Sequence, residues 1–332
     1  MLDWKIKEIE LPLLVDWHIA RGSTQVKKNF IVEIIHSPHN AQGEVAFNVR
    51  YGESAAMVKE DFERFLEACP YEIKSLEELV RFLEELSICS SLRFGIESAF
   101  VHYLALLSGK SVQELLGIDS VNMVQTSFSI PIMEPGKIEE FIIQNKLSRF
   151  HALKIKLEGA ASYGLLEQVL KCYEGKIRLD ANEGFKNPDE VLLFLEKFKK
   201  APIEFVEQPL SAEAHNDYLY LKKMTPFPLI ADESLTSNDV TSYYKERFHG
   251  VNIKLMKAGG YMKALRQIKQ ARELRLKTML GCMIETSLGI SCAMNVAHRV
   301  DYFDLDGHLL LEKDPFNQIE EENGKLFYSY LQ

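Results

Sequence analysis

Apolar and polar residues follow two different patterns along the chain. Residues 1 to about 50 contain segments rich in apolar and β-branched residues, such as Asn29–Ile35, which predict antiparallel strands. From Met57 to about Leu116, apolar residues recur at spacings of three and four, which predicts helices. We therefore expect residues 1–118 to form an α+β capping domain.

From about residue 119 the pattern becomes a repeated order of strand, loop and helix. Eight short apolar segments predict strands, and amphipathic segments fill the gaps between them. The predicted strands are Gln125–Ile130, Ala152–Leu157, Ile177–Asn182, Ile203–Pro209, Pro228–Ser234, Gly250–Leu255, Lys277–Glu285 and Tyr302–Gly307.

Eight such steps predict a (β/α)8-type barrel over residues 119–307. A doubly wound open sheet is the competing fold, but it would need a Gly-rich phosphate turn after an early strand, and the sequence has none. We expect the tail, residues 308–332, to pack back on the capping domain.

Composition narrows the class of protein. The chain has 332 residues, a net charge of −9 and no basic stripe, so we expect no nucleic-acid partner. No apolar run is long enough to cross a membrane, and the N-terminus lacks the apolar core of a signal peptide. The five cysteines are scattered without zinc-type spacing, which favours a cytoplasmic protein. We also expect a homo-oligomer.

Polar residues end most of the predicted strands, where the active site of such a barrel lies. Within Ala152–Leu157, Lys154 and Lys156 alternate with apolar residues and so share one strand face. A half-solvated antiparallel strand with its lysines in water would give the same pattern. The other polar residues at strand ends are Asp180, Asn182, Glu207, Asp232, Glu233, Lys254, Glu285, Asp304 and Asp306.

Three of these residues, Asp180, Glu207 and Asp232, end three successive strands. Side by side they would repel one another, unless a hard divalent cation occupied the all-oxygen site between them. Mg²⁺ is the expected ion, with Mn²⁺ as an alternative. The structural alternative is that these acids pair with barrel lysines or arginines.

Lys156 and Lys254 stand on strands four steps apart in a ring of eight, so we expect them to face each other across it. Such a pair suits removal of a proton beside a carboxylate and its return on the opposite face, with the metal stabilising the enediolate. Mg²⁺ and neighbouring ammonium groups should lower the pKa of such a lysine and leave some neutral amine as base. Taken alone, Lys254 could also be a solvated strand lysine.

Together these segments resemble the enolase superfamily, muconate lactonizing enzyme subgroup. The resemblance rests on the segments Lys154-Ile-Lys156, Asp180-Ala-Asn182, Val206-Glu-Gln-Pro209, Ala231-Asp-Glu-Ser234 and Asn252-Ile-Lys-Leu-Met-Lys-Ala-Gly-Gly260. It implies an α/β fold, a modified TIM barrel of the (β/α)7β type, with an N-terminal cap completed by the C-terminal tail. It implies Lys156 and Lys254 as acid/base residues and an Mg²⁺ site.

Phe303-Asp-Leu-Asp-Gly307 further resembles the Asp-x-Asp motif of the dipeptide epimerases, whose two aspartates bind the substrate ammonium group. A simple turn before the tail is the alternative. The resemblance implies that Lys154 holds the substrate carboxylate or tunes Lys156, and that Glu285 lies near Lys254. We expect Asn182, Glu233 and Lys257 to contact these site residues rather than the substrate or the metal itself.

We expect a loop of the cap to determine which substrate side chain the site accepts. Arg21 would bind a second carboxylate, or else lie at the rim, whereas Trp17 and Ile19 would favour an apolar side chain. The enzyme alternatives are o-succinylbenzoate synthase, N-acylamino acid racemase and muconate cycloisomerase, which have no use for paired aspartates. An inactive barrel that serves as a binding scaffold is the alternative outside enzymes.

Overall fold

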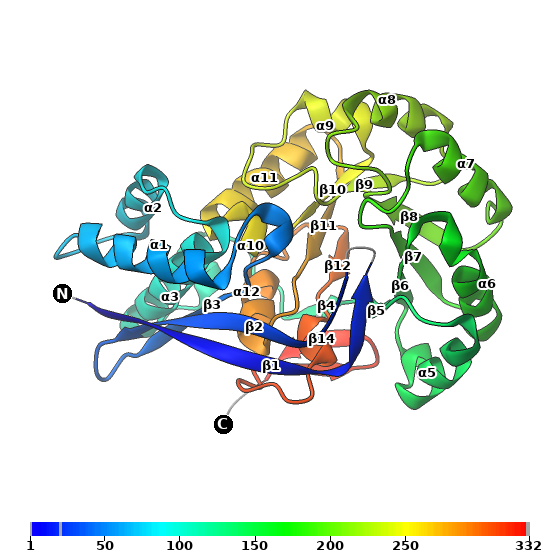
Figure 1. The fold of residues 1–332 in the computed structure, drawn as a ribbon. Helices are drawn as coiled ribbons and strands as arrows, with labels where there is room; N and C mark the ends of the chain where they lie inside the picture. Colours follow the sequence, from blue (N-terminus) through cyan, green and yellow to red (C-terminus); the bar gives the residue numbers. More distant parts are fainter. Residues whose placement is uncertain (1, 20–21, 330–332) are drawn as a thin grey trace.

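The protein consists of an α+β cap seated beside a barrel (Figure 1), in a computed structural model that describes residues 2–19 and 22–329. Strands in the described residues form a three-stranded antiparallel cap sheet, an eight-stranded parallel sheet and a small third sheet. The predicted α/β barrel fold with an N-terminal cap is confirmed.

The cap packs three helices against the antiparallel sheet. Ser54 and Ser75 accept hydrogen bonds from backbone amides in the first turns of α1 and α2, which fixes where these helices begin. The cap elements are β1 (Asp3–Ile19), β2 (Gly22–Ile35), β3 (Ala41–Val45), η1 (Val49–Tyr51), α1 (Ala55–Ala68), α2 (Leu76–Glu85), α3 (Ser90–Ser108) and α4 (Val112–Leu116).

The barrel strands are hydrogen-bonded in chain order, and a bridge between Thr126 and Phe303 joins the first strand to the last. All eight predicted strands appear among the described residues. The strands are β5 (Phe128–Ile130), β6 (Ala152–Lys156), β7 (Lys176–Asp180), β8 (Ile203–Glu207), β9 (Leu229–Ala231), β10 (Gly250–Ile253), β11 (Lys277–Gly281) and β12 (Tyr302–Asp304).

Helices cover the outer face of the barrel sheet (Figure 1). The last strand leads into the short η5 (Gly307–Leu310) rather than a full α-helix, as in a (β/α)7β barrel. The helices are α5 (Ile138–Gln144), α6 (Tyr163–Cys172), α7 (Pro188–Lys197), α8 (His215–Met224), α9 (Ser242–Arg247), α10 (Leu255–Ala258), α11 (Tyr261–Glu273) and α12 (Ser287–Asn295). No helix in the described ranges is long and apolar enough to span a membrane.

An apolar floor closes the inside of the barrel below the strand ends. Phe205, Ile230 and Met279 form a buried cluster against which Tyr302 packs. Because side chains two residues apart share a strand face, the residues two positions further along point into the same interior one layer higher. For three of these four strands those residues are Glu207, Asp232 and Asp304. A layer of apolar side chains therefore lies directly below the layer of polar side chains at the mouth of the barrel.

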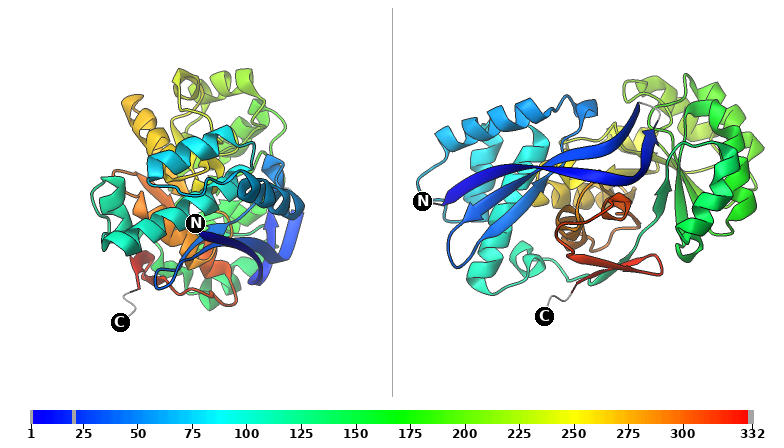
Figure 2. Two further views of the ribbon diagram at one scale, coloured as in Figure 1. Left: turned by 90° about the vertical axis from the view of Figure 1, so that its left-hand side faces the viewer. Right: turned by 60° about the horizontal axis from the view of Figure 1, so that its bottom comes forward.

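The C-terminal tail forms β13 (Ile319–Glu322) and β14 (Lys325–Tyr328), and β14 pairs with β4 (Met123–Gln125). The tail also meets the cap: Leu311 bridges Leu13, and the Glu312 amide donates to the Pro12 carbonyl at 2.9 Å. In the right-hand view of Figure 2 these two tail strands, drawn in red, lie side by side. The exact division at residues 118 and 307 stays a prediction.

Two buried glutamates of the cap dock onto the N-termini of barrel helices. Glu44 accepts hydrogen bonds from the Thr286 and Gly289 amides at the start of α12, both within 3.1 Å. Glu97 accepts one from the Met262 amide at the start of α11, at 3.0 Å. Helix N-termini favour a carboxylate, so these contacts hold the cap against the barrel.

Candidate active site

Strand β6 turns both of its lysines into the barrel. Leu153 and Ile155 are fully buried on the other face, and Lys154 is only 1% exposed. The alternative in which these lysines stand in water is therefore wrong for Lys154, and Lys156 lines a cavity at the barrel mouth. A parallel strand covered by helices leaves its inward face as the place for polar side chains.

The three predicted acid ligands meet at the ends of β7, β8 and the loop after β9. Asp180, Glu207 and Asp232 are all at most 1% exposed. In the register of the sheet, Asp180 pairs with Glu207. The structure thus brings together the carboxylates that the sequence separates by 27 and 25 positions.

Lysine ammonium groups bridge these acids. Lys154 Nζ lies 2.9 Å from an oxygen of Asp180 and 2.9 Å from one of Glu207. Lys156 Nζ lies 2.6 Å from Asp180 Oδ2, and Lys254 Nζ lies 2.9 Å from Asp232 Oδ2. The two candidate bases therefore stand at the two ends of the row of acids. Lys156 ends β6 and Lys254 directly follows β10, and these two strands face each other in the ring.

The donor set fits a hard divalent cation. Burial first, and then the charge of Asp180, raises the pKa of Glu207 to about 8. Its Oε2 atom lies 2.9 Å from Lys154 Nζ but accepts no well-aligned hydrogen bond. Positive charge is therefore insufficient at Glu207, and a cation held by carboxylate oxygens would supply it.

Within residues 2–19 and 22–329, no three His, Cys, Asp or Glu side chains already converge as a metal site. The contacts give the reason, because lysine ammonium groups occupy the carboxylate oxygens. The mouth of the barrel nevertheless has more carboxyl groups than ammonium groups. Its carboxyl groups are Asp180, Glu207, Asp232, Glu233, Asp304 and Asp306, and its ammonium groups are Lys154, Lys156, Lys254 and Lys257.

The expected lowering of the base pKa by Mg²⁺ and neighbouring ammonium groups stays a prediction for Lys254. Among the groups of the chain itself, burial lowers the pKa of Lys254, and the carboxylates of Asp232, Glu207 and Glu233 together outweigh burial and raise it above its usual range.

The paired aspartates after β12 have different partners. Asp304 Oδ2 lies 2.6 Å from Lys154 Nζ, and Asp304 Oδ1 accepts a hydrogen bond from Ser127 at 2.8 Å. Asp306 Oδ2 accepts one from the Ser129 amide at 2.6 Å. Burial, and then the charge of Asp304, raises the pKa of Asp306 to about 7. Both aspartates line the cavity, so Asp306 in particular offers its charge to a cationic ligand.

The predicted supporting residues lie around the acids. Lys257 Nζ donates to Asp232 Oδ1 and to the Asp232 carbonyl, both at 2.6 Å. The Asn182 side chain donates to Glu233 at 3.3 Å, and its backbone amide donates to Asp180 at 3.1 Å. Glu285 is buried, and burial raises its pKa to about 8; Lys254 is among the charges that act on it.

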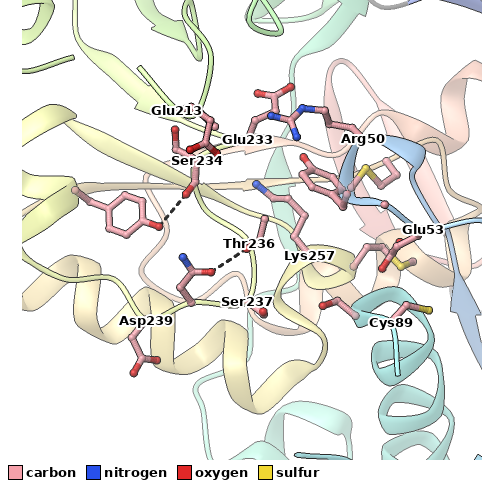
Figure 3. A pocket seen from close by; sticks show the side chains of 18 of the residues that line it. Arg50, Glu53, Cys89, Glu213, Glu233, Ser234, Thr236, Ser237, Asp239 and Lys257 are labelled. Atoms are coloured by element: carbon pink, nitrogen blue, oxygen red, sulfur yellow. Dashed lines mark hydrogen bonds between the residues drawn. The ribbon is translucent and has the colours of Figure 1, made fainter. Parts of the chain in front are cut away.

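Cap and barrel together enclose two neighbouring cavities. The inner one, of about 220 Å³, contains Lys154, Lys156, Lys254 and both aspartates. The outer one, of about 970 Å³, lies beside it, and Tyr51, Glu233 and Met283 line both. Figure 3 shows the outer cavity, in which the Arg50 side chain reaches toward the loop that carries Glu233.

The sequence analysis missed several residues of this site. Asn252 donates a hydrogen bond to Glu207 at 2.7 Å. The sequence offered a signal for Asn252, because it precedes Lys254 by two positions and should therefore point to the same side as that lysine. Arg50 forms a two-pronged ion pair with Glu183, both contacts at 2.6 Å, across the cap–barrel junction. Lys27 lines the inner cavity. No local pattern indicates either cap residue. Arg21 lies outside the described residues.

Comparison with known proteins agrees with this fold. Residues 139–325 match the family described as enolase C-terminal domain-like. An L-Ala-D/L-amino acid epimerase from Pedosphaera parvula is 34% identical over 329 residues, which cover 96% of this chain and 94% of that protein. The chain therefore belongs to the enolase superfamily, in which its curated relatives are isomerases.

Two solved structures share the whole fold. An enolase family member from Agrobacterium tumefaciens with homology to dipeptide epimerases, solved with sodium and L-Ala-L-Glu, has a TM-score of 0.88 at 27% identity over 98% of this chain and 97% of that one. A dipeptide epimerase from Enterococcus faecalis, solved with Mg and L-Leu-L-Tyr, has a TM-score of 0.87 at 23% identity over 98% and 96%. The dipeptides bound in these two structures differ in their C-terminal residue, which is Glu in the first and Tyr in the second.

Proposed function

We propose that this protein is an Mg²⁺-dependent dipeptide epimerase. It inverts the α-carbon of the C-terminal residue of an L,L-dipeptide by proton transfer between two lysines. The observation that carries the proposal is the placement of Lys156 and Lys254 on facing strands, at opposite ends of one row of buried acids.

In this mechanism one lysine amine removes the α-proton, and the ammonium group of the opposite lysine delivers a proton to the other face. Turnover leaves the first lysine protonated and the second neutral, and exchange with solvent restores the starting state. Which lysine acts first depends on the configuration of the substrate. Inversion requires two bases on opposite faces because a single base returns its proton to the face it came from.

Asp306, with Asp304 behind it, holds the ammonium group of the substrate through charge-assisted hydrogen bonds. Lys154 neutralises Asp180, Glu207 and Asp304 from below and keeps these acids in one layer. Lys257 fixes Asp232 from the side opposite Lys254. The dipeptide is thus held at its amino end while its α-carbon lies between the bases.

Asp180, Glu207 and Asp232 would hold the metal, with Mn²⁺ as an alternative to Mg²⁺. When bound, the ion supplies positive charge beside the substrate carboxylate as negative charge develops there. The donor set supports this role because it is all-oxygen, buried and deficient in positive charge at Glu207.

The alternatives explain less of the site. o-Succinylbenzoate synthase, N-acylamino acid racemase and muconate cycloisomerase act on substrates without a free ammonium group, for which two buried aspartates at the cavity are unfavourable. An inactive scaffold gives no reason for two lysines, each beside an acid, on facing strands. A cytoplasmic location and a homo-oligomeric state stay predictions from the sequence.

The experiment is a dipeptide library incubated with the protein and Mg²⁺ in deuterated water. We expect some L,L-dipeptides to gain one mass unit and to invert at the C-terminal residue, and a chelator to abolish both changes. If no dipeptide exchanges its α-proton, the proposal is wrong. Exchange that continues after the metal is removed would refute the metal's role.

A further inference from the structure

Side chains lace together the first and last strands of the barrel sheet. Within the described residues, β5 and β12 share no run of paired positions, and an isolated bridge joins the two segments. Asp304 accepts a hydrogen bond across this seam from the Ser127 hydroxyl at 2.8 Å, and Asp306 accepts one from the Ser129 amide at 2.6 Å. The two aspartates that the proposed function assigns to the substrate's ammonium group therefore also help to close the barrel.

Arg178 approaches this seam from β7. It lies two positions before Asp180 on the same strand, so its side chain points into the barrel, where it is only 5% exposed. Its guanidinium group lies 5.4 Å from the ring centres of Phe205 and of Tyr302, and its Nε donates to Glu204 at 2.8 Å. The apolar layer below the mouth thus contains a buried cation that is held from two sides.

The far end of the guanidinium group contacts the seam itself. Its Nη1 donates to the Phe303 carbonyl at 2.6 Å and to the Ser127 hydroxyl oxygen at 3.2 Å. Since an arginine can only donate hydrogen bonds, Ser127 accepts from it and keeps its own proton for another partner. Asp304 Oδ1 lies 2.8 Å from that hydroxyl, whereas the Phe303 carbonyl lies 3.5 Å away. Arg178 therefore sets the direction in which the Ser127 hydroxyl donates.

Asp304 is consequently an acceptor at both of its oxygens. Oδ1 accepts from Ser127, and Oδ2 lies 2.6 Å from the ammonium group of Lys154, which stands beside Arg178 in the register of β6 and β7. Donors at both oxygens favour the charged form of a carboxylate and fix its orientation. Asp304 thereby stays in place beside Asp306 on the wall of the inner cavity.

We propose that Arg178 is a positioning residue for the substrate's ammonium group, and that it acts from below through Ser127 and Asp304. The inference rests on the proposed function, in which the two aspartates bind that ammonium group. Arg178 itself does not line the inner cavity. Any effect of Arg178 on substrate binding must therefore pass through the residues between it and the cavity.

The experiment measures steady-state kinetics of variants with a free dipeptide and with its N-acetylated form, used as a substrate or as a competitive inhibitor. We expect Ser127→Ala to raise KM for the free dipeptide by about 5- to 10-fold, with kcat within about 2-fold, because Asp304 loses one of its donors. The KM or inhibition constant of the N-acetylated form should change by less than about 2-fold, since that form has no ammonium group.

Arg178→Met should raise KM in the same selective way. Because Arg178 acts through Ser127, the double variant should show no larger loss than the single variants. If Arg178→Met does not fold, Arg178→Lys serves in its place, since lysine keeps the charge but lacks the planar fork that reaches several acceptors at once.

Thr278→Val is the matched control. It also removes a buried hydroxyl that donates to an aspartate beside β12, because Thr278 Oγ1 lies 3.1 Å from Asp301 Oδ2. Asp301 precedes β12, at the end of the strand opposite to Asp304, and does not line the inner cavity. This variant should leave the constants of both dipeptide forms unchanged.

The inference is wrong if Ser127→Ala weakens both dipeptide forms equally or weakens neither. It is also wrong if the losses of the two single variants add up in the double variant. In these cases the proposed function stands as long as the unchanged protein exchanges α-protons of dipeptides. If the unchanged protein exchanges none, the proposed function and this inference fail together.

Discussion

The barrel mouth and the cap wall enclose the same cavity, but different forces position their residues. At the mouth, the register of hydrogen-bonded strands fixes Asp180 beside Glu207, and no side-chain contact is needed to align them. The cap wall is held by side-chain bonds to the barrel, such as the pair of Arg50 with Glu183. We therefore expect the barrel mouth to carry the chemistry, and the cap wall to determine which substrate is accepted.

The largest expected effect comes from changing an acid at the mouth. Glu207→Gln keeps the shape of a fully buried side chain and removes one negative charge. We expect epimerase activity to fall about 10³-fold or more, because the charge beside the reacting carboxylate is lost. Calorimetric titration with Mg²⁺ should show at least about 10-fold weaker binding.

Glu196→Gln, on the exposed face of α7, is the control for this change and should alter neither quantity. An unaltered Mg²⁺ titration curve for Glu207→Gln would refute the assignment of Glu207 as a metal ligand.

A second, smaller effect is expected at the aspartate pair. Asp306→Asn should lower kcat/KM for free dipeptides by about 10- to 100-fold, because a charge-assisted hydrogen bond to the substrate ammonium group is lost. N-acetylated dipeptides lack that ammonium group and should change by less than about 3-fold. Steady-state kinetics on both substrate types decides the matter, and equal losses on the two would contradict ammonium binding at Asp306.

In the cap, Arg50→Met should raise KM by about 5- to 10-fold with little change in kcat. The variant loses a partly buried ion pair that ties the Val49–Tyr51 turn to the barrel loop after β7. Arg266→Met removes an exposed ion pair, at 3.9 Å from Glu84, across the same two parts of the molecule. That control should leave KM unchanged, and a variant of Arg50 that lowers kcat alone would argue against a positioning role.

The smallest effect concerns stability. Burial raises the pKa of Glu97 from its usual value of 4.5 to about 7. Its contribution to stability is full below pH 4.5 and is lost as the pH rises to 7, because the unfolded chain then releases a proton that the folded protein still binds. Glu97→Gln should therefore gain on the order of 2 kcal/mol relative to the unchanged protein between pH 5 and pH 8. Denaturant unfolding at both values checks this; an equal difference at pH 5 and pH 8 would contradict it.

The sequence predicted the barrel part of the site because strand period and strand order translate directly into geometry. Lys156, Asp180, Glu207, Asp232 and Lys254 all fall at strand ends, and parallel strands bring their ends together. What it could not predict is which oxygen meets which ammonium group, since this depends on rotamers and on burial. The sequence alone therefore does not show that an Asp232 oxygen lies 2.9 Å from Lys254 Nζ.

The cap part was less predictable for a physical reason. Lys27 and Arg50 reach the barrel mouth because the cap docks onto the barrel. Glu44 and Glu97, far away in sequence, contribute to this docking at helix N-termini. No periodicity links residues at such separations, and a lone lysine on a strand looks the same whether it faces a cavity or water. Lys27 lines the inner cavity, whereas Lys28, the next residue, forms exposed ion pairs with Glu8 and Glu10.

The most direct test of the two-base claim measures deuterium exchange separately from each configuration of the substrate. An L,L-dipeptide and its L,D-epimer are incubated with Lys156→Ala and with Lys254→Ala in deuterated water, and α-proton exchange is followed by NMR. We expect each variant to retain exchange from one configuration and lose it from the other, with the opposite choice for the two variants. If both variants lose or keep exchange from the same configuration, the two lysines do not serve opposite faces of the carbon.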